Sequence, residues 1–318
     1  MLIFLLLLSL RGLKCGIDTA QYMRLFRQYS SKTMEQLLSN ETHELGYIIL
    51  NRIVGAVTDN YQYLLLATSL ICVLPLWYFY QKESEIPLLT MALFLAVSPF
   101  NMYFSGIRQT IAMSIGILAW YAAKNKKPVR FLCIVGLAMM FHTSSFILVL
   151  LYPLYHVRIT KSWLWFVLPA MAMVYVFRDE IFSFALELLW KDYEVTKETG
   201  AFMILLLLVL FAVYSYIMVE DKTLDQDTIG MRNLLLLSVV LQIFAMLHPL
   251  SMRMNYYFLI FIPILIPKIA KRCKKQFVNL SAISVVIMTA YFLYYFVNMM
   301  IIDDDYLNIF PYIPFWKN

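Results

Sequence analysis

The number of membrane crossings depends on how one stretch is interpreted, RFLCIVGLAMMFHTSSFILVLLYPLY, residues 130–155. It is apolar except at its middle, where His142 is followed by Thr143, Ser144 and Ser145. One helix of about 20 apolar residues crosses a bilayer, but polar side chains at mid-depth need a partner or water. The stretch is therefore either one long span or two half-spans that meet at His142.

Two basic loops decide between these alternatives. KNKKPVR (124–130) carries four basic residues and KIAKRCKK (268–275) carries five, and neither carries an acidic one. Because short basic loops stay in the cytoplasm, an even number of crossings must separate them. One span over 130–155 makes the count five, whereas two half-spans make it six. We therefore predict a hairpin or re-entrant pair hinged at His142, buried in protein or lining a wet cavity.

The composition points to a membrane protein. Of the 318 residues, 62% are hydrophobic and 14% are charged, and the mean hydropathy is +0.71. Soluble domains have about 45–50% apolar and about 25% charged residues. This excludes a water-soluble enzyme, a disordered chain, a disulfide scaffold and a nucleic-acid-binding domain. We predict an all-α polytopic membrane protein, a single membrane-embedded domain over 1–318 with about ten transmembrane helices.

The expected elements follow the apolar segments. A remnant span at 1–10, which we interpret as the end of a longer helix, precedes an external polar region over 11–60. That region contains an amphipathic helix at 45–57, which is too short to cross and is expected at the interface. Besides the broken segment, the expected spans cover 61–80, 86–103, 107–123, 163–177, 201–219, 233–248, 254–267 and 278–302.

The basic loops also set the predicted sidedness. The N-terminus is expected in the cytoplasm and the C-terminus outside, together with the loop 178–200 and the acidic tail beginning at Asp303. The net charge of +6 is then explained by the Lys and Arg residues that collect in cytoplasmic loops, and it gives no reason to expect nucleic-acid binding. The loops expected on the cytoplasmic side are 81–85, 124–130, 156–162, 220–232 and 268–275.

Two arginines open expected helices at the external face. Arg108 begins the span 107–123, beside Gln109, and Arg253 begins the span 254–267, shortly after His248. Helix N-termini offer free N–H groups and a positive dipole end, and a guanidinium binds phosphate bidentately. The pair predicts an anion site, with Gln109 and His248 as accessory binding residues. The alternative is that each arginine only snorkels to the interface.

The other candidate residues are polar groups that apolar packing does not explain. His142 could accept a proton from a sugar hydroxyl or bind phosphate, or it could be a structural histidine. Asp18 could bind substrate or N-cap a helix beginning at Thr19. Further candidates for substrate binding in the polar region are Arg11, Tyr22 and Glu44.

No cofactor or metal is expected. The four cysteines form no CxxC and no Cys/His pair, which argues against a metal site and a disulfide. The sequence also contains no P-loop, HExxH, GxSxG or GxGxxG motif.

Five segments resemble the EpsG family of Wzy-like bacterial polymerases of capsular polysaccharide and exopolysaccharide. They occur in the family's order, and GIRQ followed about 33 residues later by FH is their most specific part. The segments are LRGLKCGIDTAQY (10–22), ELGYIILNRIV (44–54), FSGIRQTIAMSI (104–115), FHTSSFIL (141–148) and RMNYYF (253–258).

The resemblance implies a metal-independent glycosyltransferase of GT-C-like helical architecture in the bacterial plasma membrane. Such enzymes move a growing glycan from undecaprenyl diphosphate onto a lipid-linked repeat unit at the outer face. Arg108 and Arg253 would hold the pyrophosphate, His142 would activate the acceptor hydroxyl, and Asp18 and Glu44 are secondary candidates. Expected partners are the lipid-linked oligosaccharide, the bilayer, a chain-length regulator and a flippase.

Three other functions are compatible with parts of the sequence. A transporter or flippase of lipid-linked oligosaccharide would use the same arginines, but it predicts hydropathy repeats, and none is visible. A related membrane glycan ligase or an acyltransferase is the second alternative. Acyltransferases also have a membrane-embedded histidine, but GIRQ with the external arginine pair favours phosphate over thioester chemistry. A non-enzymatic scaffold would leave the intramembrane charges without a role.

Overall fold

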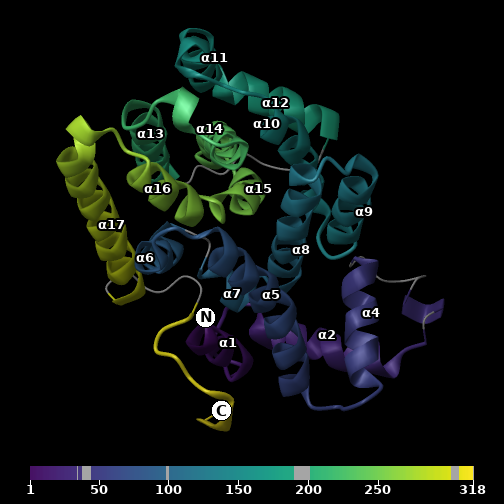
Figure 1. The fold of residues 1–318 in the computed structure, drawn as a ribbon. Coiled ribbons are helices and arrows are strands. Elements are labelled where there is room, and N and C mark those ends of the chain that lie inside the picture. Colours follow the sequence, from purple (N-terminus) through teal and green to yellow (C-terminus); the bar gives the residue numbers. More distant parts are fainter. Residues whose placement is uncertain (34, 38–43, 98–99, 190–200, 302–307, 318) are drawn as a thin grey trace. The chain divides into compact units, whose positions relative to one another are not determined.

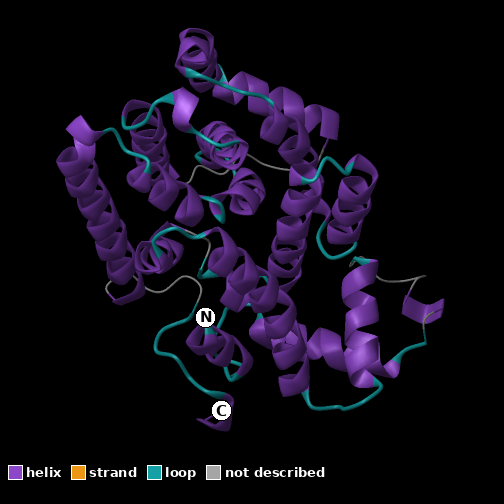
Figure 2. Ribbon diagram, viewed as in Figure 1, coloured by secondary structure: helices purple, strands orange, loops and turns teal. Residues whose placement is uncertain are grey.

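A computed structural model describes the chain except for residues 34, 38–43, 98–99, 190–200, 302–307 and 318. Its described parts are helices joined by loops, without a strand among them (Figure 2). By length and composition, three of the described helical segments can cross a membrane: Tyr61–Glu83, Gln226–Ala245 and Lys275–Asn298. The all-helical membrane class is confirmed, and the number of about ten spans stays a prediction.

The chain divides into two compact units, and we describe each by itself. The first consists of residues 1–83, 99–149 and 292–318, and the second of 84–98 and 150–291. The prediction of one membrane-embedded domain stays a prediction. The first unit contains α1 (Leu2–Ser9), α2 (Thr19–Ser31), α4 (Leu45–Gly55), α5 (Tyr61–Glu83), α7 (Met102–Ser105), α8 (Ile107–Lys124), α9 (Pro128–Met139) and the 3-10 helix η1 (Thr143–Leu150).

In the first unit, α8 is the helix around which the others pack. It contacts both α5 and α9, while α1 packs on α5 and α2 packs on α4 (Figure 1). Almost every side chain of α8 is buried, and a Cβ at Gly116 would lie only 3.1 Å from the side chain of Leu148. Small residues allow this kind of close approach between membrane helices. With a rise of about 1.5 Å per residue, Arg108 and Lys124 lie about 24 Å apart along α8.

The expected break at His142 is present. α9 ends at Met139, and the N–H groups of Phe141 and His142 both donate to the carbonyl of Ala138, at 3.0 Å. The chain then starts a new helix, η1, at Thr143. The break in the helix is therefore confirmed, and the hairpin or re-entrant pair of half-spans stays a prediction.

In the second unit, α14 is largely buried and packs against α10, α13, α15 and α16. The unit's elements are α6 (Pro87–Val97), α10 (Leu151–His156), α11 (Leu164–Val176), α12 (Arg178–Leu189), α13 (Ala201–Ile217), α14 (Gln226–Ala245), α15 (Pro249–Leu259) and α16 (Ile262–Lys271). The last long helix, α17 (Val278–Ile301), has residues in both units.

Two expected elements of the second unit take another form in the structure. The expected span at 254–267 consists of two helices, α15 and α16, which are bent by 46° relative to each other and together are long and apolar enough for one broken span. Pro263 lies in the first turn of α16, and proline interrupts a continuous helix because it lacks an N–H and clashes with the preceding turn. The expected loop 178–200 begins as the helix α12, whose first turn contains Asp179 and Glu180. Its remainder, like Asp303, lies outside the described residues.

The loops expected on the cytoplasmic side are linked by polar contacts within each unit. In the first unit, the ammonium of Lys124 lies 3.4 Å from the carboxylate of Glu83. In the second, Glu85 pairs with Arg272, which lies 2.9 Å from Asp225, and Asp221 accepts the N–H of Lys161 at 2.8 Å. The contact in the first unit joins the loops 81–85 and 124–130, and those in the second unit join Glu85 to the loops 220–232 and 268–275 and the loop 156–162 to the loop 220–232. The common side of the five loops stays a prediction.

Candidate functional site

The carboxylate of Glu44 joins three segments that are distant in the sequence. Glu44 directly precedes α4, and its Oε2 pairs with Nη1 of Arg108 in the first turn of α8. Its Oε1 lies 3.1 Å from Nδ1 of His142 and accepts the N–H of Thr143 at 3.3 Å. The start of α4, the start of α8 and the hinge after α9 therefore meet at one carboxylate.

A glycine fixes α4 against the hinge. The N–H of Gly46 donates to the carbonyl of Met140 at 2.7 Å, and a Cβ on Gly46 would lie 2.7 Å from that oxygen. Real Cβ atoms do not approach a backbone oxygen so closely, so any larger residue would push α4 away from the hinge. Gly46 thus holds Glu44 within reach of His142.

Tyr22 completes the cluster from α2. Its hydroxyl is hydrogen-bonded to Arg108. Its ring packs edge-on against Tyr47, with centroids 5.6 Å apart, and Tyr47 is fully buried beneath it. We call Tyr22, Glu44, Arg108 and His142 the Glu44 cluster. All four were candidates from the sequence, and the structure brings them together.

The charge of Glu44 determines which ring nitrogen of His142 carries the hydrogen. Partial burial acts to raise the pKa of Glu44, but the hydrogen bond with His142 and the charge of Arg108 lower it to about 2. An ionised carboxylate only accepts hydrogen bonds, so Nδ1 of His142 carries the hydrogen. In the neutral ring, Nε2 is then the acceptor. The side chains of Arg108, Glu44 and His142 are 25%, 14% and 17% exposed, so solvent reaches the cluster.

The other candidates of the first unit have structural contacts. Arg11 is buried and donates to the carbonyl of Leu8 at 3.1 Å, and Gln109 is buried in α8. Asp18 precedes α2, but its carboxylate makes no N-cap hydrogen bond, so the expected capping is wrong. The hydroxyl of Thr19 instead donates to the carbonyl of Cys15 at 2.7 Å. The substrate-binding roles of Arg11, Asp18 and Gln109 stay predictions.

Arg253 and His248 belong to the second unit. α15 begins at Pro249, so Arg253 lies in its second turn and does not open a helix as expected. The helix starts early because Nδ1 of His248 accepts the N–H of Leu250 at 3.0 Å, and proline favours the first helical position. The argument from a helix N-terminus therefore applies to Arg108 and not to Arg253. Their meeting at one anion site stays a prediction.

Sequence reasoning missed the contacts that hold the cluster together. Neither the N–H of Thr143 nor the close approach at Gly46 has a signature in one sequence, although a glycine two residues after a candidate carboxylate was a usable signal. Among the described residues, no group of three His, Cys, Asp or Glu side chains could hold a metal ion.

Comparison with known proteins gives a family. A family model described as the EpsG family matches residues 1–313. No curated protein and no solved structure matches the chain. The segments that resemble this family include ELGY, GIRQ and FHT, which contribute Glu44, Arg108 and His142 to the cluster. The chain belongs to the EpsG family.

Proposed function

We propose that this protein is a glycan polymerase. It would transfer a growing chain from undecaprenyl diphosphate to a lipid-linked repeat unit at the outer face of the bacterial plasma membrane. The observation that carries the proposal is the Glu44 cluster, in which one carboxylate holds an arginine and an oriented imidazole together. Membership of the EpsG family supports the substrate class.

In the proposed function Arg108 binds the diphosphate. It lies in the first turn of α8, where backbone N–H groups and the positive end of the helix dipole favour an anion. Its side chain is partly exposed and is held by Glu44 and Tyr22. In this role Arg108 would stabilise the charge that develops on the leaving diphosphate.

His142 would act as the general base. Its Nε2 takes the proton of the acceptor hydroxyl while the hydroxyl oxygen bonds to the anomeric carbon of the donor sugar. The bond from that carbon to the phosphate oxygen breaks, and its electron pair leaves with undecaprenyl diphosphate. Glu44 is a positioning residue, which orients the ring and stabilises the imidazolium that forms.

The position of the cluster along α8 supports chemistry at the outer face. The end of α8 opposite to Arg108 carries Lys124 and continues into the basic loop 124–130. If that loop is cytoplasmic, Arg108 points to the outside, and His142 lies with it. From the sequence alone, His142 was expected at the middle of the membrane, where a substrate at the outer face would reach it only through a water-filled cavity.

A deletion strain complemented with variants tests the proposal through gel analysis of its lipid-linked glycans. With Glu44→Gln we expect single repeat units to accumulate on the outer leaflet, while Glu35→Gln, an exposed carboxylate of the same polar region, leaves polymer formation normal. Accumulation only on the cytoplasmic leaflet would indicate a flippase. Normal polymer with Glu44→Gln at equal protein levels would also contradict the proposal.

A further inference from the structure

The helices α2 and α4 both lead away from the Glu44 cluster. Near their N-terminal ends Tyr22 packs on Tyr47, and near their C-terminal ends a Cβ on Gly55 would lie 2.2 Å from Oγ of Ser30. Tyr29, near the C-terminal end of α2, also packs on Tyr47, with ring centroids 6.4 Å apart, so aromatic rings bridge the two helices. With 11 residues and a rise of about 1.5 Å per residue, α4 is about 16 Å long.

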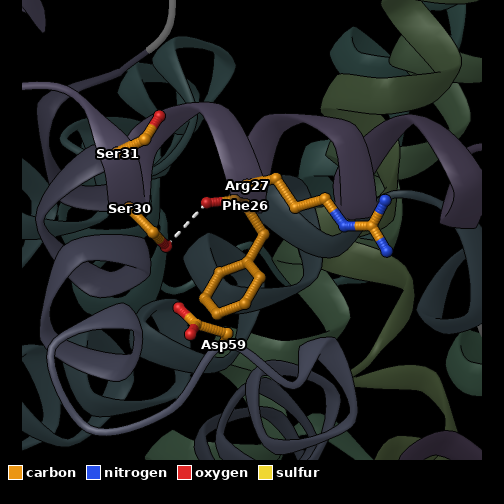
Figure 3. A pocket seen from close by; sticks show the side chains of 5 residues that line it. All are labelled: Phe26, Arg27, Ser30, Ser31 and Asp59. Carbon is orange, nitrogen blue, oxygen red and sulfur yellow. Dashed lines mark hydrogen bonds between the residues drawn. The ribbon is translucent and has the colours of Figure 1, made fainter.

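A pocket of about 370 Å³ lies at the far end of this helix pair. Four lining residues come from two turns of α2, namely Phe26, Arg27, Ser30 and Ser31, and Asp59 comes from the loop after α4. In Figure 3 the carboxylate of Asp59 and the hydroxyl of Ser30 lie on the same side of the Phe26 ring, whereas the guanidinium of Arg27 extends away along α2.

The polar groups on the Asp59 side of the Phe26 ring are hydrogen-bond acceptors. The hydroxyls of Ser30 and Ser31 already donate to the carbonyls of Phe26 (2.7 Å) and Gln28 (3.1 Å), so their oxygens remain as acceptors. Asp59 adds an exposed carboxylate. Such a surface suits a ligand that donates several O–H groups. It does not suit phosphate, because the carboxylate repels an anion.

We propose that this pocket is a glycan subsite that binds one hydroxyl-rich sugar residue of the saccharide whose reacting end lies at the Glu44 cluster. This inference rests on the proposed function. α2 and α4 would form the track along which the sugar chain lies, since both helices reach from the cluster to the pocket. The subsite does not touch the reacting atoms, so it determines how well a longer glycan is held and not whether a bond forms.

The first test measures binding to the full-length protein in lipid nanodiscs by saturation-transfer NMR. The probe is a set of oligosaccharides released by mild acid from the polymer of the cells that encode this protein. We expect Asp59→Ala to weaken binding about tenfold, since it removes one or two hydrogen bonds to a charged acceptor. The control Glu35→Ala, another exposed carboxylate, should bind like the wild type. Equal binding by Asp59→Ala, or displacement of the oligosaccharides by inorganic phosphate, would overturn the subsite.

The second test uses polymer length in the complemented deletion strain. We expect Asp59→Ala and Ser31→Leu to give shorter chains while the first condensation continues, because only longer glycans reach the pocket. Chains of normal length from both variants, with polymer lost in Glu44→Gln, would overturn the subsite alone. Polymer formation by Glu44→Gln would instead overturn the proposed function, and the two failures are thus distinguishable.

Discussion

Two arginine–carboxylate pairs, one in each unit, have the same chemistry and opposite surroundings. In the second unit, Arg232 is 0% exposed and lies 2.8 Å from Asp221, with its guanidinium carbon 3.9 Å from the centre of the Tyr216 ring. In the first unit, the Arg108 side chain is 25% exposed, and its carboxylate partner Glu44 also binds His142.

The difference in solvent exposure separates a structural role from a functional one. Every face of Arg232 is covered, by a carboxylate, by an aromatic ring and by the carbonyl of Ile159 at 2.8 Å, so this pair can only hold helices together. The pair of Arg108 and Glu44 is open to solvent and is coupled to a titratable ring. Substitutions in the sealed pair should therefore change mainly stability, and substitutions in the open pair should change mainly activity.

The largest effect is expected from His142→Ala. Loss of a general base lowers the rate of glycan transfer by about 10²–10⁴-fold. A condensation assay with purified lipid-linked repeat units in nanodiscs measures the rate, and size-exclusion chromatography of the tagged protein measures folding. We expect a normal elution profile, because the ring is partly exposed. Transfer at the wild-type rate would remove His142 from the mechanism.

The sealed pair should show the largest loss of stability. Arg232→Leu leaves the carboxylate of Asp221 without its buried partner, which costs about 3–5 kcal/mol of folding free energy. Thermal unfolding in detergent measures the change, with the exposed Arg24→Leu of the first unit as the control. If both variants melt at the wild-type temperature, the comparison between a sealed and an open pair fails.

Arg108→Lys should reduce activity without reducing stability. Lysine keeps the charge but cannot form the planar fork that binds two phosphate oxygens. We expect a loss of transfer of about 10²–10³-fold, as for the loss of one preorganised donor to a developing charge. The condensation assay and the melting temperature, measured on the same preparation, separate the two effects. A lower melting temperature with unchanged transfer would make Arg108 a structural residue like Arg232.

The smallest expected effect is the contribution of Glu44 to the pH dependence of folding stability. Its pKa is lowered from 4.5 to about 2, so its contribution to stability is fully present above about pH 4.5 and is lost as the pH falls toward 2. Glu44→Gln removes this contribution. The gap in melting temperature between wild type and variant should narrow on acidification from pH 5 to pH 3, and a constant gap would contradict the lowered pKa.

The sequence predicted the hinge at His142 because loop charges constrain the parity of the crossings. It also named the members of the Glu44 cluster, but it ranked Glu44 as secondary. The role of Glu44 depends on contacts with residues 64 and 98 positions away, and no local pattern encodes such contacts.

The errors have local physical causes. Hydropathy begins after Arg253, whereas the helix begins at Pro249, because capping and not apolarity sets a helix start. α12 was expected as a loop because its acidic residues lower the hydropathy, although acidic residues favour the first turn of a helix.

We propose that Glu44 acts on glycan transfer through His142, and a double-mutant cycle measures this coupling. Rates of glycan transfer are measured for Glu44→Gln, His142→Ala and the double variant, at equal amounts of folded protein in nanodiscs. If Glu44 works by orienting and charging the ring, the double variant is no slower than His142→Ala alone, since residues that act as a unit are not additive. A double variant whose loss is the product of the two single losses would contradict this, because Glu44 and His142 would then act independently.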